Sequence, residues 1–202
     1  MTSVAAIVLA AGQSRRMGAQ NKLLIALDGQ PMVRRVVQTY VRAIPGPVVV
    51  VTGFERDRLQ AALTAMPVSF AHNPAFATGQ QTSVAVGLRA APDAALLLVG
   101  LADQPALTAE ELDALIARHR AGDPEKISVP MREGQRGNPI VIPRGLRARL
   151  THSAGQPGCK RFTRDHPQHV QFVEMATDGF FTDIDRPADT LAFLSRQTEP
   201  MS

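Results

Sequence analysis

Residues 4–22 have the sequence VAAIVLAAGQSRRMGAQNK, and this stretch decides the fold that we predict. Residues 4–9 form a short apolar run rich in Val and Ile, which is typical of a buried strand. Ala10, Ala11 and Gly12 follow, and they have almost no side chain. A strand that leads directly into such a turn gathers backbone N–H groups at one point, where they bind anions.

Polar and cationic side chains follow this turn. Ser14, Arg15, Arg16 and Lys22 lie within ten residues of Gly12, and the cations among them suit a triphosphate. An ordinary α/β protein with a glycine turn and solvated arginines is the alternative interpretation. The stretch contains neither G-x-x-x-x-G-K-[ST] nor G-x-G-x-x-G, so a P-loop and a dinucleotide fingerprint are not supported.

The same residues resemble the signature of the MobA-like nucleotidyltransferases, L-A-[AG]-G-x-S-x-R-M-G followed by a lysine. The stretch is most similar to the molybdenum cofactor cytidylyltransferases, which have Ala where Ala11 stands, whereas related guanylyltransferases usually have Gly. The resemblance implies an α/β fold: a three-layer, Rossmann-like, mostly parallel sheet with helices on both faces. It also implies a nucleotide phosphate site formed by Leu9, Ala10, Ala11, Gly12, Ser14, Arg16 and Lys22.

Composition limits the classes of protein to consider. The 202 residues are 45% hydrophobic and predict one domain, 1–202, with a packed core. The net charge of +4 comes with 4% aromatic residues and no Trp, so we expect anionic small substrates and no nucleic acid. No apolar run is long enough for a membrane span, and the lone Cys159 excludes an internal disulfide. We therefore expect a cytoplasmic protein that binds no membrane.

The order of elements predicts a parallel sheet. Apolar runs at 48–51 and 67–71 follow the first strand, and helical patterns separate all three. This βαβαβ order is typical of a doubly wound sheet, whose ligands lie beyond the carboxyl ends of the strands. Gly12 and the loop 72–79 fall at that edge.

The loop 72–79 and the helix predicted at 80–91 supply further candidate residues. Thr78 or Thr82 could simply cap that helix. The segment also resembles N-P-x-x-x-x-G-x-x-x-S-x-x-x-G-L, which in the family holds base and ribose. The resemblance assigns Asn73, Gly79 and Ser83 to the nucleotide.

Asp103 follows the apolar strand predicted at 94–99. A carboxylate at the carboxyl end of a central strand can bind Mg²⁺, although a lone loop Asp is more often a turn former. The segment GLADQP resembles the family motif G-D-Q-P, with Ala102 in place of Gly. The resemblance makes Asp103 a ligand of Mg²⁺.

Asp183 and Asp185 precede the last predicted helix. Two carboxylates two residues apart on an extended segment point to the same side. Asp185 could instead cap that helix. The segment DIDRPAD resembles the family motif D-I-D-T-P-E-D, whose second Asp completes the metal site, so we assign Asp185 to Mg²⁺ and keep Asp183 in reserve.

Residues 131–139 predict a hairpin with a charged tip. RGNP at its end resembles the family motif R-G-[HN]-P on the acceptor side of the cleft, which assigns Arg136, Gly137 and Asn138 to acceptor binding. Residues 155–162 resemble the family segment G-D-x-G-x-R. Lys160 or Arg161 could reach the acceptor phosphate, or could belong to a solvated basic helix.

The resemblance implies a complete reaction. Lys22, Arg16 and Asp103 are the expected catalytic residues, and CMP would pass from CTP to the phosphate of molybdopterin-bound molybdenum with release of pyrophosphate. A molybdenum hydroxylase or dehydrogenase apoenzyme would be the partner. The alternatives are a sugar or polyol phosphate as acceptor, and a cofactor-binding chaperone without transferase activity.

Overall fold

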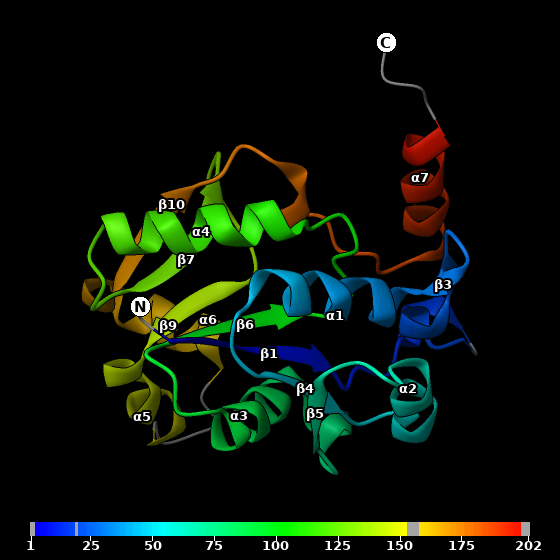
Figure 1. Cartoon of the computed structure of the whole chain (residues 1–202), viewed down its shortest axis with the longest axis horizontal. Helices are drawn as coiled ribbons and strands as arrows, with labels where there is room; N and C mark the ends of the chain where they lie inside the picture. The colour runs from blue at the N-terminus through cyan, green and yellow to red at the C-terminus, as the bar shows by residue number, and fades with distance from the viewer. Residues whose placement is uncertain (1–2, 19, 153–157, 199–202) are drawn as a thin grey trace.

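The computed structural model describes residues 3–18, 20–152 and 158–198. Its main sheet has eight strands in the order β10-β7-β9-β6-β1-β4-β5, with β8 paired to β7 (Figure 1). The strands of this sheet are β1 (Val4–Ala10), β4 (Val48–Thr52), β5 (Val68–His72), β6 (Leu96–Leu101), β7 (Ile127–Arg132), β8 (Gln135–Arg136), β9 (Ile140–Pro143) and β10 (Val170–Glu174). A separate antiparallel pair is formed by β2 (Ala26–Leu27) and β3 (Gln30–Pro31).

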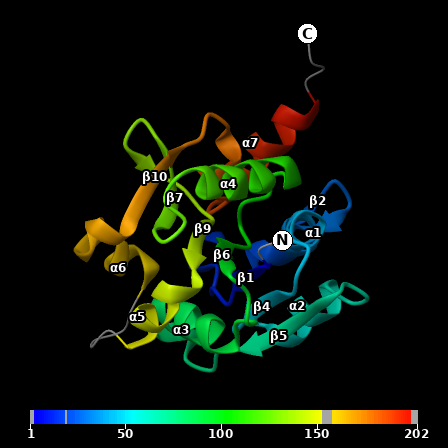
Figure 2. The ribbon, with the colours of Figure 1, turned by 60° about the vertical axis from the view of Figure 1, so that its left-hand side comes forward.

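Helices cover both faces of the sheet, so the three-layer α/β fold predicted from the sequence is confirmed (Figure 2). In Figure 1, α1 and α4 lie along one face, whereas α3 and α5 lie along the other. The helices are α1 (Met32–Ala43), α2 (Arg56–Ala62), α3 (Gln80–Ala90), α4 (Ala109–Ala121), α5 (Arg144–His152), α6 (Cys159–Asp165) and α7 (Pro187–Thr198).

The central strand β1 shows why two helical layers are needed. All seven of its residues are buried, and successive side chains of a strand point to opposite faces. Val4, Ala6 and Val8 therefore join the core beneath α1 and α4, whereas Ala5 and Ile7 join the core beneath α3 and α5. The apolar run at the start of the sequence is thus the centre of both cores.

Strand β1 pairs in parallel with β4 on one side and with β6 on the other, and β4 pairs in parallel with β5. From β1 the chain adds β4 and then β5 on one side, and it then returns to place β6 on the other side of β1. The strand order therefore reverses between β1 and β6, and an open α/β sheet forms its ligand crevice at such a point. Strand β9 is antiparallel to both of its neighbours, β6 and β7, which the sequence did not predict.

Within the described residues, no helix is long and apolar enough to cross a membrane. Residues 155–157, which begin the segment resembling G-D-x-G-x-R, lie outside the described residues.

Candidate active site

The loop after β1 carries Lys22 into the crevice. It contains two short 3₁₀ turns, η1 (Arg15–Met17) and η2 (Lys22–Leu24). The backbone N–H of Lys22 donates to Ser14 Oγ at 3.1 Å, and Asn21 Oδ1 accepts from the N–H of Leu23 at 3.1 Å. These local bonds fix the direction of the chain at Lys22, whose side chain is almost fully buried.

Lys22 meets two carboxylates from distant parts of the chain. Its Nζ lies 2.6 Å from Asp103 Oδ2 and 2.7 Å from Asp185 Oδ1. Asp103 follows β6, and its backbone carbonyl accepts from the N–H of Ile184 at 2.9 Å. That backbone bond holds the segment before α7 against the end of β6, so Asp185 reaches the same ammonium group as Asp103.

Arg16 closes the cluster from the solvent side. Its Nη1 lies 2.5 Å from Asp185 Oδ2. Burial alone would lower the pKa of Lys22, but the two carboxylates, Asp103 foremost, outweigh burial and raise it. Burial alone would likewise raise the pKa of Asp185, but Lys22 and Arg16 outweigh burial and lower it. Lys22 and Asp185 are therefore both charged at neutral pH.

Asp183 differs from its neighbour Asp185. The residue is exposed as a whole, yet the walls of the crevice surround its carboxyl group, and this burial raises its pKa to about 6. Repulsion from Asp103 adds to the increase. The pKa of Asp183 therefore lies nearer to neutral pH than the pKa of Asp185.

Tyr40 of α1 supports the strand that ends at Asp103. The ring is fully buried, and burial raises the pKa of its hydroxyl. A Cβ atom on Gly100 would lie 1.8 Å from the Tyr40 hydroxyl oxygen, so only glycine fits there. This close approach lets α1 pack against β6 immediately before the site.

A cavity of about 570 Å³ opens around the loop after β1. A Cβ atom on Gly12 would meet no protein atom within 4 Å, so the packing does not require glycine at this position. The missing side chain instead leaves room in the cavity, as a ligand that contacts the backbone needs. The predicted residues that line this cavity are Leu9, Ala11, Gly12, Ser14, Arg16, Lys22, Gly79, Ser83, Asp103 and Asp185.

Two residues predicted to bind the nucleotide do not line this cavity: Ala10 and Asn73. Asn73 is buried, and its Nδ2 donates to Thr82 Oγ1 and to Ser83 Oγ, both at 2.9 Å. Its Oδ1 accepts from the N–H of Ala75. Asn73 thus joins the loop after β5 to the first turn of α3 behind the wall of the cavity, because its short side chain turns inward.

The structure also tests the two helix-capping roles that were considered, by Thr78 or Thr82 at α3 and by Asp185 at α7. Helix α3 begins after Gly79 without a side-chain cap. Thr82 Oγ1 donates to the carbonyl of Gly79 and accepts from the side-chain amide of Asn73, and it does not cap a backbone N–H of the helix. At α7, it is Asp189 that accepts from the N–H groups of Asp185 and Arg186. The capping role considered for Asp185 was wrong, and its carboxylate is free to contact Lys22.

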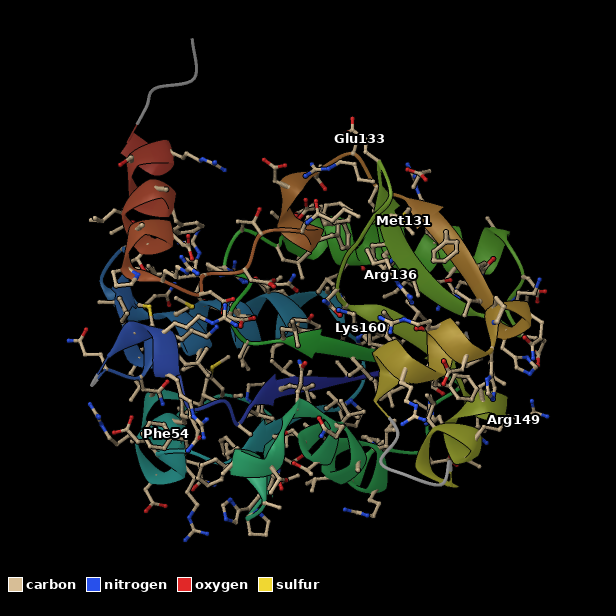
Figure 3. All side chains as sticks on the ribbon, turned by 180° about the vertical axis from the view of Figure 1, so that it is seen from behind. Phe54, Met131, Glu133, Arg136, Arg149 and Lys160 are labelled. Atoms are coloured by element: carbon tan, nitrogen blue, oxygen red, sulfur yellow. The ribbon has the colours of Figure 1, made fainter. Side chains whose placement is uncertain are left out.

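A second cavity of about 830 Å³ adjoins the first, and Leu9, Gln80, Leu101 and Asp183 line both. The predicted acceptor residues Arg136, Gly137 and Asn138 line it, as do Lys160 and Arg161. The hairpin considered for residues 131–139 exists, because β7 and β8 pair antiparallel. Figure 3 labels Arg136 and Lys160, which come from β8 and α6.

Sequence reasoning missed several residues of the two cavities. Gln80 and Leu101 lie between them, and Phe76 lines the first. Gln80 is the first residue of the helix predicted at 80–91, and no role at the site was predicted for it. Its position could have been predicted, because the first turn of this helix begins at the edge of the sheet where ligands bind.

The fit of a divalent metal depends on Asp103 and Asp185. Within the described residues, no group of three or more His, Cys, Asp or Glu side chains is arranged to hold a metal ion. Mg²⁺ commonly uses only one or two carboxylates together with water and substrate phosphates. Asp103 Oδ1 is buried and has no hydrogen-bond partner among the described residues, so a carboxylate oxygen at this site is available to a cation.

Comparison with known proteins identifies the family. The model of the MobA-like NTP transferase domain matches residues 6–170, which include most of β1, the loop with Lys22, Asp103 and Arg136. The chain belongs to this family. The resemblance seen in the sequence is confirmed, and the chain is a MobA-like nucleotidyltransferase domain.

Curated relatives of this MobA-like domain have diverse names. The chain is 27% identical to nicotine blue oxidoreductase of Paenarthrobacter nicotinovorans over 187 residues, which cover 90% of this chain and 92% of the relative. It is 30% identical to the bifunctional protein GlmU of Legionella pneumophila over 142 residues. That match covers 70% of this chain but only 31% of GlmU.

Solved structures share the fold at low identity. A nucleotidyl transferase from Methanothermobacter thermautotroptrophicus superposes with a TM-score of 0.81 at 22% identity, covering 96% of this chain and 97% of that chain. Rv0371C of Mycobacterium tuberculosis in complex with manganese has a TM-score of 0.71 at 19% identity, covering 96% of this chain and 99% of that chain.

Proposed function

We propose that this MobA-like domain transfers CMP from CTP to the phosphate of molybdopterin-bound molybdenum and releases pyrophosphate, with Mg²⁺ as cofactor. The contact of Lys22 with Asp103 and Asp185 carries the proposal. This cluster lines the cavity around the loop after β1. Asp183, which precedes Asp185 by two residues, lines both that cavity and the cavity of Arg136, so the cluster lies next to the boundary between the proposed nucleotide side and acceptor side.

The reaction needs no protein nucleophile. An oxygen of the acceptor phosphate attacks the α-phosphorus of the nucleotide, and the bond from the α-phosphorus to the oxygen that bridges to the β-phosphate breaks. Pyrophosphate leaves with that bridging oxygen. The protein contributes positioning and charge neutralisation, which supply most of the catalysis in phosphoryl transfer.

The residues of the first cavity have separate roles in this step. Backbone groups around Gly12, at the end of β1, bind the phosphates, with Ser14 bracing the loop. Arg16 and Lys22 neutralise the negative charge that develops on pyrophosphate. Both cations pair with Asp185, so each must exchange a carboxylate for a phosphate when the triphosphate binds.

Asp103 and Asp185 are the residues that would hold Mg²⁺. When bound, this ion supplies charge neutralisation between the α-phosphate and the leaving group. The unpartnered Asp103 Oδ1 supports this role, and so does the manganese complex of a protein with the same fold.

The base and the acceptor depend on the resemblance. Ala11 lines the first cavity and matches the cytidylyltransferase form of the motif, which favours CTP. Arg136, Gly137 and Asn138 line the second cavity and would hold the acceptor. A molybdenum hydroxylase or dehydrogenase apoenzyme would receive the product. A sugar or polyol phosphate acceptor, or a carrier role without transfer, remains the alternative within this site.

A second candidate function is an oxidoreductase. The similarity to nicotine blue oxidoreductase covers nine-tenths of both chains, so a redox reaction in the same two cavities is the competing hypothesis. It would need a redox cofactor or second substrate bound where we place CTP.

One experiment compares these functions. Pyrophosphate release is measured with CTP, ATP or GTP and Mg²⁺, with and without molybdenum-loaded molybdopterin. Release with CTP only in the presence of the pterin supports the proposal, and release with another nucleotide changes only the base. Absence of release with every pairing, combined with oxidation of NADH or NADPH by an added electron acceptor, would favour the oxidoreductase.

A further inference from the structure

The second cavity, which Lys22 does not line, has a strongly cationic wall. Arg136 of β8 faces it, and α6 adds Lys160, Arg161 and Arg164. Among the acidic side chains that line the cavity, Asp183 lies at the boundary with the first cavity and Asp165 lies on α6. The balance of charge on this wall is therefore positive.

Arg161 has a partner, because its Nε lies 3.4 Å from Asp165 Oδ2. The other three cations have no carboxylate within ion-pair distance among the described residues: Arg136, Lys160 and Arg164. A group of like charges without counter-ions is repulsive, and an anion is what relieves such repulsion.

Arg136 is the most constrained of the three. It is half-buried, and its Nη2 donates to Thr163 Oγ1 of α6. Its guanidinium carbon lies 5.7 Å from the centre of the Phe172 ring. Burial, followed by the nearby charge of Arg164, lowers the pKa of Arg136. A cation held in place by a hydroxyl and a ring, but without a carboxylate, is poised for a ligand anion.

The middle of the cavity is apolar. Val84, Val99, Val129 and Ile140 line it between the cationic wall and Asp183. The cavity of about 830 Å³ is much larger than a single phosphate needs, and it is within the usual range for organic ligands. It therefore offers a cationic end that can bind an anion, apolar lining residues and a junction with the first cavity.

We infer that the acceptor carries a second anionic group, which binds to Arg136, Lys160 and Arg164 while its reacting phosphate lies beside Lys22. This inference rests on the proposed transfer reaction and defines its substrate class. The acceptor is a phosphate ester with a flat or apolar middle and an anionic group at the far end. The three cations act as specificity residues, because they take no part in the chemical step.

Anion binding without nucleotide tests the subsite directly. Calorimetry of the full chain with orthophosphate compares the wild type with Arg136→Gln and Lys160→Gln. We expect each substitution to raise the Kd by about 10-fold, the usual effect of losing one charge-assisted hydrogen bond. Lys160 is exposed, so Lys160→Gln keeps the fold even if Arg136→Gln does not.

Two controls make the result specific. Arg149→Gln removes the same charge from neighbouring α5, outside the cavity, and is expected to change the Kd by less than about 2-fold (Figure 3). Arg16→Gln measures how much of the phosphate signal comes from the nucleotide side. Equal weakening by Arg149→Gln and Arg136→Gln, or no weakening by Lys160→Gln, would overturn the inference.

The chemistry of the anion is resolved by parallel titrations with molybdate, orthophosphate and acetate. Tightest binding of molybdate indicates an oxo-metal end, orthophosphate a second phosphate, and acetate a carboxylate. With an active acceptor, Arg136→Gln should raise the KM for the acceptor and leave the KM for the nucleotide unchanged. Oxyanion binding that depends on Arg136 without any pyrophosphate release would refute the transfer reaction and keep the subsite.

Discussion

Lys22 Nζ lies 2.6 Å from Asp103 Oδ2, and this contact joins the loop after β1 to the segment that follows β6. The same ammonium contacts Asp185, so it occupies the space between the two carboxylates that would bind Mg²⁺. A cation and a metal ion that share the same oxygens compete for them. The nucleotide relieves this competition, because its phosphates attract the ammonium away from the carboxylates.

Lys22→Met is therefore expected to change two affinities in opposite directions. Mn²⁺ binding without nucleotide should tighten by about 3-fold or more because the carboxylates become free, while triphosphate binding should weaken by about 10-fold. Calorimetry and the electron paramagnetic resonance signal of Mn²⁺ measure both. Lys126→Met is the control, because Lys126 pairs with Asp123 at the surface. A parallel loss of both affinities would show that Lys22 has only a structural role.

Asp103→Asn should lower turnover by about 1,000-fold, because it removes a metal ligand and the main partner of Lys22. The fold should persist, since the bond from Ile184 uses the backbone carbonyl of Asp103. Pyrophosphate release and circular dichroism give the two readouts, with Asp123→Asn as a surface control. A folded Asp103→Asn protein with wild-type turnover would remove Asp103 from the metal site.

Gly12→Ala should separate ligand binding from folding. No protein atom lies within 4 Å of the added methyl group, so the free energy of unfolding should change by less than about 0.5 kcal/mol. Nucleotide affinity should fall by about 10-fold, because the methyl group occupies space in the cavity. Calorimetry and urea unfolding test both statements, and Gly145→Ala in α5 should leave affinity unchanged. Unaltered nucleotide binding by Gly12→Ala would place the phosphates elsewhere.

His119 predicts a pH dependence of stability. It is fully buried on α4, its Nδ1 lies 2.8 Å from Ser128 Oγ, and burial, with Arg120 adding, lowers its pKa below 6.5. As pH falls below 6.5, His119 therefore becomes protonated in the unfolded state while it is still neutral in the folded state, which favours unfolding. The stabilisation is fully present above that pH and is lost as pH approaches the folded pKa.

Urea unfolding between pH 5 and pH 8 measures this effect. His119→Gln should flatten the slope below pH 6.5 by up to about 1.4 kcal/mol per pH unit, the value for one proton. His72→Gln, at the exposed end of β5, is the matched control for replacing a histidine by glutamine. If both variants gave the wild-type slope, the proton uptake would belong to other groups.

Local patterns in the sequence predicted the parallel half of the fold well. The buried strands and the helices between them follow from residues close together in the chain. The hairpin of β7 and β8 is local in the same way. Periodicity and turn chemistry act over a few residues, so they are readable without the tertiary structure.

Side-chain direction could not be read in this way. Asn73 follows β5 directly, which led to the prediction that it binds the nucleotide. Its side-chain amide instead points away from the first cavity and donates to Thr82 and Ser83. Asp189, and not Asp185, binds the N–H groups at the start of α7. Both outcomes depend on which partner is nearer in space, and spacing along the chain does not contain that information.

The sequence alone was enough to predict that a turn of small residues follows a buried strand and that carboxylates follow later elements, because both are properties of short segments. Only the tertiary structure decided that Lys22 meets Asp103 and Asp185, which are 81 and 163 residues away in the chain. It also decided that Arg136 meets Thr163 of α6 across the second cavity. Such contacts arise from strand order and the packing of distant elements, so only the folded chain defines them.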